Sequence, residues 1–243
     1  MTVLDTSEDA FGQALLDYSA GKLGQTLILE RDDGSSGPAL QPAEFFAPPD
    51  AWPEWEQHAL AAVSGPVLDL GAAAGRHSLF LQQAGHEVTA VDHSPGAVDV
   101  CRARGVLDVR LSDLTDPPED RRWGAVLLMC GNLGLAGDRR ATRSLLVRLT
   151  RGCRPDAIVV TDTVDPTVGN DASDLAYLDR NLRMGREIGL VRLRLRYGDL
   201  VTPWWDLLLV PRPEIDRLVD GTGWAVRERI DDGAEYLLTL ARV

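Results

Sequence analysis

The sequence predicts an α/β fold, in which strands and helices alternate around an open sheet. The first observation is the stretch 67–78, where a short apolar run ends in a glycine-spaced turn and a helical pattern follows at once. The second is a length of 243 residues with 44% hydrophobic composition, which suits one globular domain with a sizeable core. The third is the series of further apolar runs after residue 86, several of which end in polar or glycine-rich residues.

Overall charge and composition narrow the classes of partner. With a net charge of −12 and a pI near 4.7, the chain repels phosphate backbones, so we expect no nucleic-acid partner. No apolar run approaches the roughly 18 residues of a membrane span, and the first residues lack the pattern of a signal peptide. Three scattered cysteines, Cys101, Cys130 and Cys153, favour neither a disulfide framework nor a zinc site. We therefore expect a cytoplasmic protein, and the sequence leaves its oligomeric state unknown.

The first 60 residues differ in composition from the rest. Residues 1–20 predict a helix, and a strand-like run follows at 26–29 in a region rich in glycine, proline and aspartate. The residues 32–35 predict a turn, and a helix beginning near Trp52 leads to the first strand of the main domain. We expect 1–60 to form a cap, which is either a lid that shapes a substrate pocket or an arm that only covers the sheet.

The glycine-spaced turn indicates a site for a polar or anionic cofactor. Glycine lets a ligand approach closely, and the N-terminus of the following helix offers unpaired N–H groups. The dinucleotide pattern G-x-G-x-x-G places Gly71, Ala73 and Arg76 in its glycine positions, and Arg76 fits the last position poorly. The stretch instead resembles motif I of class I S-adenosylmethionine-dependent methyltransferases, an acidic residue followed by G-x-G-x-G, here Asp69, Gly71, Ala73 and Gly75. The chain departs from that motif at Ala73.

The next two strands supply acidic residues at their ends. The run 87–91 ends in Asp92, about 20 residues beyond the glycines, where a carboxylate is expected to bond ribose hydroxyls. A helix follows, with Ser94 as its N-cap and Gly105 as its end. After the strand 106–111, the resemblance implies adenine contacts from Asp113 and Leu114. The full set of donor-binding candidates is Asp69, Gly71, Ala73, Gly75, Asp92, His93, Asp113, Leu114, Cys130 and Asn132.

A fourth strand at 125–130 opens into the glycine-rich loop 131–137. Ligands of open parallel sheets bind beyond the carboxyl ends of the strands, so we expect this loop to face the methyl donor and acceptor. Asn132 either orients a ligand or is a turn residue in left-handed conformation. A helix with an apolar face follows, and the turn 153–156 is expected to lead into the strand 157–161.

The last third of the chain combines a polar insertion with a closing hairpin. We expect a helix near 174–184, an alternating strand at 190–197 and a further strand across 200–210. A short helix at 213–220 precedes two strands, 224–230 and 235–242. These match the antiparallel hairpin of the class I sheet, so the resemblance covers 60–243. It implies a Rossmann-like, mostly parallel seven-stranded sheet with helices on both faces. We expect a cap of 1–60 and a methyltransferase domain of 61–243 that carries a substrate-side insertion of 164–210.

The leading functional hypothesis is methyl transfer from S-adenosylmethionine to an oxygen or nitrogen of a small molecule, without a metal. His77 and Asn132 are the catalytic candidates, although a lone histidine here is more often structural. Substrate candidates are Tyr18, Trp204 and Trp205, with core or edge packing as the alternative for the tryptophans, and the arginines at 192–196 suit a solvated face. The rival hypotheses are a non-catalytic protein that binds S-adenosylmethionine and a nicotinamide-dependent oxidoreductase.

Overall fold

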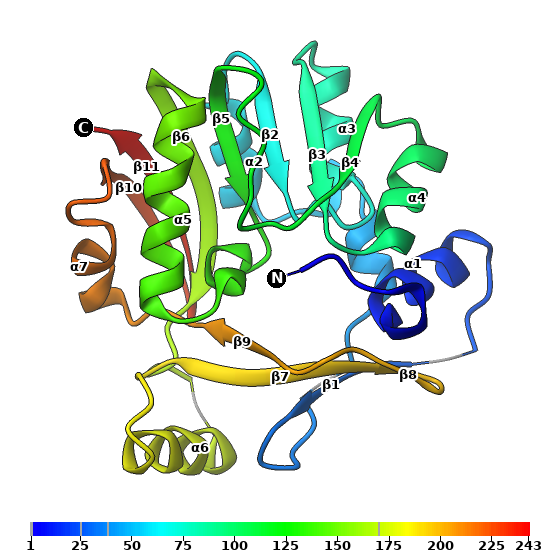
Figure 1. Cartoon of the computed structure of the whole chain (residues 1–243), viewed down its shortest axis with the longest axis vertical. Helices are drawn as coiled ribbons and strands as arrows, with labels where there is room; N and C mark the ends of the chain where they lie inside the picture. Colours follow the sequence, from blue (N-terminus) through cyan, green and yellow to red (C-terminus); the bar gives the residue numbers. More distant parts are fainter. Residues whose placement is uncertain (1, 25, 38, 170) are drawn as a thin grey trace.

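A seven-stranded sheet forms the larger part of the molecule (Figure 1). The structure, a computed structural model, describes residues 2–24, 26–37, 39–169 and 171–243. The strand order is β10-β11-β6-β5-β2-β3-β4, with parallel pairing from β4 to β6 and antiparallel pairing of β11 with both of its neighbours. The strands are β2 (Val67–Leu70), β3 (Val88–Asp92), β4 (Asp108–Leu111), β5 (Trp123–Leu128), β6 (Cys153–Val164), β10 (Trp224–Asp232) and β11 (Glu235–Arg242). The predicted Rossmann-like sheet with its closing hairpin is confirmed.

Helices cover both faces of this sheet because its central strands are apolar on both sides. Every residue of β2 and of β5 is buried, as expected for parallel strands that lie between two helical layers. Leu60 and Leu81 pack on one face, whereas Leu146 and Leu218 pack on the other. The helices are α1 (Ala10–Ser19), α2 (Glu54–Ala61), α3 (Arg76–Gln83), α4 (Pro95–Arg104), α5 (Arg139–Gly152), α6 (Ala172–Arg183) and α7 (Ile215–Val219). In the described ranges no helix has the length and apolar character needed to cross a membrane.

A smaller sheet lies beyond the carboxyl ends of the main strands, which point toward it in Figure 1. This second sheet consists of β1 (Leu27–Arg31), β7 (Leu190–Tyr197), β8 (Leu200–Val201) and β9 (Trp205–Leu208). β1 pairs antiparallel with β7, so that Leu27 lies opposite Tyr197. The expected cap and the expected insertion therefore share one sheet, while the division of the chain into domains stays a prediction.

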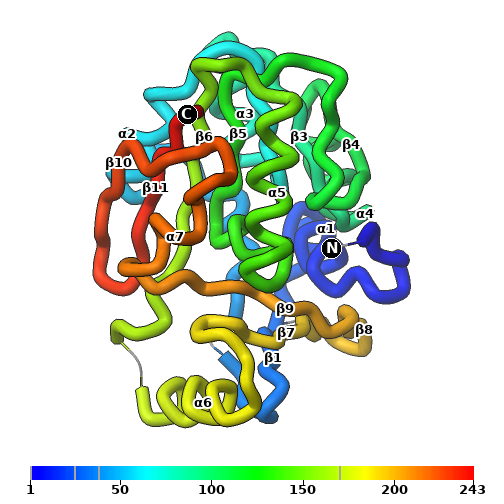
Figure 2. The backbone as a smooth tube through the Cα atoms, turned by 60° about the vertical axis from the view of Figure 1, so that its left-hand side comes forward, coloured from blue at the N-terminus to red at the C-terminus, as the bar shows by residue number. Residues whose placement is uncertain are grey.

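Helix α1 lies between the two sheets (Figure 2). Ala10 and Ala14 pack against Leu27 and Tyr197, whose side chains define the inner face of the second sheet. On its other side α1 places Leu15 in a cluster with residues of α4. Because Leu27 and Leu15 are fully buried, this helix joins the second sheet to the main domain through apolar contacts.

One buried carboxylate fixes the angle between α1 and α4. Asp9 caps α1 by accepting from the Gly12 N–H, and it also accepts from the Ser94 hydroxyl and the Gly96 N–H, each at 2.8 Å. Ser94 in turn caps α4, as predicted, by accepting from the Ala97 N–H. Two helix N-termini thus share Asp9, which is 4% exposed.

Two local predictions are wrong. The residues 153–156 form no turn, because β6 begins at Cys153 directly after α5. A bulge between the pairs Trp123–Cys153 and Ala125–Ile158 accommodates Pro155. The single strand expected across 200–210 is divided into β8 and β9, with Pro203 in the interruption. Proline lacks the N–H that a continuous ladder needs.

We predict that Gly96→Ala loosens α1 from the main domain. A methyl group at this position would lie 2.6 Å from the Gly12 Cα, so the two helices have to move apart. Overpacking of this kind costs about 1–3 kcal/mol in the free energy of unfolding, although alanine is the better helix former. Urea unfolding checks this, with Gly24→Ala as the control, because nothing lies within 4 Å of the added carbon there. Equal stability of both variants would contradict the packing described here.

Candidate functional site

The turn after β2 and the end of β3 meet at one carboxylate. Asp92 accepts from the Ala73 N–H with one oxygen and from the Ser94 N–H with the other, both at 2.9 Å. Ala73 has a φ of +51°, so it adopts the left-handed conformation that a glycine would adopt in motif I. Each Asp92 oxygen keeps a lone pair for a further donor, although the residue is only 3% exposed.

Asp69 and Asn132 make hydrogen bonds that support the turn after β2. The Ser78 hydroxyl donates to Asp69 at 2.6 Å, and burial raises the pKa of the Asp69 carboxyl. The Asn132 amide donates to the carbonyl oxygens of Leu70 and Gly71, at 2.9 and 3.0 Å. Both amide protons are thereby used, so only the Asn132 oxygen is left for a ligand. These contacts favour a structural role for both residues.

A second strained turn follows β5. Cys130 and Gly131 have φ values of +61° and +77°, and the Asp162 carboxylate at the end of β6 accepts from both of their N–H groups. Burial raises the pKa of Asp162 to about 6, against the lowering effect of these two hydrogen bonds. Cys130 itself is exposed, and its Sγ lies 3.4 Å from an Arg76 nitrogen. The ends of β5 and β6 therefore form one polar corner.

Sequence reasoning missed a buried ion cluster beside this corner. Glu56 of α2 is 3% exposed and lies 2.6 Å from His77 Nε2 and 3.2 Å from an Arg76 nitrogen. The Trp52 ring packs edge-on against His77. No local signal distinguishes Glu56 from an ordinary solvated helix residue, because its partners lie some 20 positions away. His77 is 6% exposed, so its packing favours the structural alternative over a catalytic one.

The predicted adenine side contains Asp113, Leu114 and His93. Thr115 donates both its N–H and its hydroxyl to Asp113, and these bonds lower the pKa of Asp113 although burial acts in the opposite direction. Leu114 packs in the main core. His93 Nδ1 is buried 3.4 Å from Asp92, and no group of the described residues makes a hydrogen bond to it. A buried polar atom in this state points to a missing partner.

The aromatic substrate candidates lie in three different surroundings. Tyr18 packs on Phe46 with ring centroids 4.8 Å apart. Trp204 lies under the Arg194 guanidinium, which bonds Glu30 on the outer face of the second sheet. The arginine row is thus a paired, partly solvated face. Trp205 lies opposite Leu193 and packs with the inner-face cluster, and its buried Nε1 has no hydrogen-bond partner in the described ranges.

Together these residues fit a nucleoside with a hydroxylated sugar. Asp92 has acceptor capacity for a pair of hydroxyl groups, and His93 Nδ1 makes no hydrogen bond within the described residues. The two turns with positive φ lie at the ends of β2 and β5, where ligands of open sheets bind. Among the described residues, no group of three histidine, cysteine, aspartate or glutamate side chains is arranged to hold a metal ion.

Comparison with known proteins agrees with the resemblance to methyltransferases found in the sequence. Residues 67–156 match the family model described as a methyltransferase domain. The fold is similar to that of a SAM-dependent methyltransferase from Bacteroides fragilis solved with S-adenosyl-L-homocysteine, with a TM-score of 0.84 and 24% identity over 100% of this chain and 98% of that one.

Two further solved structures share the fold at lower similarity. They are the CcbJ methyltransferase from Streptomyces caelestis (TM-score 0.58, 16% identity, 80% of this chain and 94% of that one) and a sugar N-methyltransferase from Streptoalloteichus (TM-score 0.58, 16% identity, 78% and 85%). No curated protein matches the sequence.

We predict that Glu56→Ala destabilises the protein strongly. Removal of this carboxylate leaves the partly buried Arg76 and the buried His77 without their shared partner, and breaking a buried pair costs about 3–5 kcal/mol. The free energy of unfolding in urea measures the effect. Glu54→Ala in the same helix is the control, since Glu54 is exposed and its loss should change stability by no more than about 0.5 kcal/mol. Similar losses in both variants would argue against the cluster.

Proposed function

We propose that this chain, which has the methyltransferase domain and the fold of the class I S-adenosylmethionine-dependent methyltransferases, methylates an oxygen or nitrogen of a small molecule. The match of residues 67–156 to a methyltransferase domain supports the enzyme class and the methyl donor. The acceptor class, the absence of a metal requirement and a cytoplasmic location are parts of the proposal. One protein of similar structure is a sugar N-methyltransferase, and a small acceptor of that kind agrees with the proposal.

The observation that supports the proposal most is the meeting of Ala73 and Asp92. A left-handed turn at the end of β2 donates to a carboxylate at the end of β3, and that carboxylate keeps lone pairs for sugar hydroxyls. His93 Nδ1, which is buried 3.4 Å from Asp92 and has no hydrogen-bond partner among the described residues, adds a second polar group on the same side. Asp113 and Leu114 then flank the position that the family uses for the base.

Methyl transfer requires that the acceptor atom be positioned next to the methyl group, and it needs few acid or base groups. When bound, S-adenosylmethionine supplies a methyl group already activated by its sulfonium. Asp92 would hold the sugar of the donor, whose methyl group would pass to the lone pair of the acceptor while the electron pair of the broken carbon–sulfur bond stays on sulfur, and Asp162 or water would take the acceptor's proton. The chain contributes the polar corner formed by Cys130 and Asp162, which would position the acceptor beside the methyl group.

Two rival functions are separable by one binding measurement each. Tight binding of NAD and no binding of S-adenosylhomocysteine, by calorimetry, would favour an oxidoreductase. Binding of S-adenosylhomocysteine without turnover of S-adenosylmethionine on any acceptor in a metabolite mixture would favour a non-catalytic binding protein. Turnover that survives a chelator would support the metal-independent reaction that we propose.

We predict that Asp92→Ala weakens binding of S-adenosylhomocysteine by about 1–3 kcal/mol. The substitution removes the acceptor for the sugar hydroxyls and frees the Ala73 N–H, so the turn loses its support as well. Calorimetry on the folded variant measures the change. Asp99→Ala is the control, because Asp99 is exposed on α4 and pairs only with Arg102. An unchanged affinity in Asp92→Ala would remove the main support for the proposal.

We also predict that turnover rises with pH through an apparent pKa of about 6. Below that value Asp162 is protonated and one of its oxygens no longer accepts from the Cys130–Gly131 turn, whereas above it both N–H groups are bonded. Asp162→Asn should abolish this inflexion. Asp156→Asn, an exposed position near the start of the same strand, should keep it. A profile that is flat between pH 5 and 7 in the unaltered enzyme would refute the assignment.

A further inference from the structure

A cavity of about 460 Å³ lies between the second sheet, α6 and the end of β6. Its volume falls in the range of about 300–1,000 Å³ that is usual for small-molecule pockets. Leu29, Leu193 and Leu207 form one apolar wall, and Tyr177 of α6 and Val164 of β6 line two others. The interior is therefore mainly apolar.

The lining leucines of β7 and β9 lie on one face of the second sheet, because Leu193 and Leu207 have the same parity in the pairing of these strands. Leu193 alternates with Leu195 and Tyr197 along β7, and those two residues pack against α1. Leu207 alternates with Trp205 along β9, so the indole with the unpartnered Nε1 lies about 7 Å along the strand from the cavity wall. The inner face is thus continuous from α6 to α1.

The cavity also adjoins the polar corner through β6. Val164 lies two residues beyond Asp162 on the same side of the strand, because the pairing of β6 with β11 is regular there. Two residues of strand correspond to about 7 Å. A molecule whose body occupies the cavity can therefore place an oxygen or nitrogen beside Asp162 and Cys130, where the methyl group is transferred under the proposed function.

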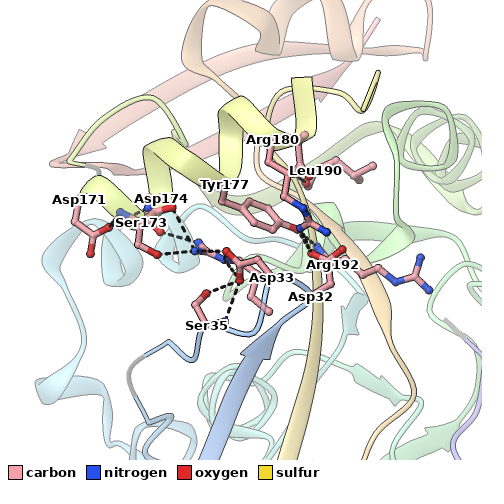
Figure 3. Close-up of polar contacts among 12 residues, drawn as sticks. Asp32, Asp33, Ser35, Asp171, Ser173, Asp174, Tyr177, Arg180, Leu190 and Arg192 are labelled. Atoms are coloured by element: carbon pink, nitrogen blue, oxygen red, sulfur yellow. Dashed lines mark hydrogen bonds and ion pairs between the residues drawn. The ribbon is translucent and has the colours of Figure 1, made fainter. Parts of the chain in front are cut away.

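The charged edge of the cavity excludes anions. Arg31 is the cation of its lining, and its N–H groups are already bonded to Asp33, Asp174 and the Ser173 hydroxyl at 2.8–3.2 Å. Figure 3 shows Asp33, Ser173 and Asp174 close together at this edge. Four of the five N–H donors of Arg31 are used in this way, which leaves no bidentate site for a carboxylate or a phosphate. Asp171 is also on the lining, so carboxylates outnumber guanidinium groups at this edge.

We infer that this cavity holds the body of the methyl acceptor, and that the acceptor is largely apolar and either neutral or cationic. The inference rests on the proposed function and adds the class of substrate to it. Leu29, Leu193 and Leu207 contact the apolar body, while Asp171 and Asp174 favour a positive far end and disfavour a negative one.

Three probes with the same apolar body and different ends test this inference. Phenylbutylamine, phenylbutanol and phenylbutyrate are titrated into the full chain saturated with S-adenosylhomocysteine, and their binding is followed by ligand-observed NMR. We expect the amine and the alcohol to bind about tenfold more tightly than the carboxylate. Equal affinities, or no binding of any probe at millimolar concentration, would overturn the inference.

Two variants localise the binding. Val164→Phe fills the cavity and should weaken the amine and the alcohol about tenfold, while Val147→Phe on the exposed side of α5 should leave them unchanged. Asp174→Asn keeps the shape of the edge, removes one negative charge and should reduce the preference for the amine over the carboxylate about threefold. If Val164→Phe does not fold, the result for Asp174→Asn decides whether the inference stands.

Affinity for S-adenosylhomocysteine, measured on every variant, separates the two levels of the proposal. If S-adenosylhomocysteine binds normally and the affinities of the probes are the same in Val164→Phe and Asp174→Asn as in the unaltered protein, the cavity is not the acceptor pocket. The proposed function then still stands. If the unaltered protein does not bind the nucleoside, the proposed function fails, and the inference that rests on it fails too.

Discussion

Backbone N–H groups from two neighbouring corners converge on the Asp92 carboxylate, and the arrangement around the site depends on that convergence. Ala73 reaches it from the turn after β2, and Ser94 reaches it from the start of α4. The Ser94 hydroxyl continues the connection to Asp9, which holds α1 and so the second sheet. One series of charge-assisted hydrogen bonds thus runs from the cofactor turn to the cap.

Residues 1–20 and 190–208 act as one structural unit although most of the chain lies between them. The leucines on the inner face of the second sheet pack on α1 and line the cavity near α6. Leu29 and Arg31 of the expected cap line the cavity, and the function of the cap as a lid stays a prediction. Trp204 and Trp205 are adjacent in sequence but have different surroundings, because Trp204 lies with the charged outer face of the second sheet and Trp205 packs on its inner face.

Local chemistry in the sequence is sufficient to predict most of the main domain. Ser94, Pro95 and Gly105 delimit α4 by capping rules, and glycine at 71 and 75 marks the turn after β2. The pairing of Leu27 with Tyr197 and the contact of Glu56 with His77 were not predictable, because no periodicity connects distant segments. Glutamate on a short amphipathic helix has the same pattern whether it faces solvent or a buried histidine.

The pairing of β1 with β7 also sets an order of events during synthesis. At about 5–20 residues per second, Leu27 leaves the ribosome on the order of ten seconds or more before Tyr197 does. Until then the β1 segment has no partner strand, and the nascent chain exposes the apolar side chains of this edge. The residues of the polar corner are made in between, so they leave the ribosome before β7 and β9 do. A translational pause after β6 would prolong that uncovered stage and make the nascent enzyme more prone to aggregation.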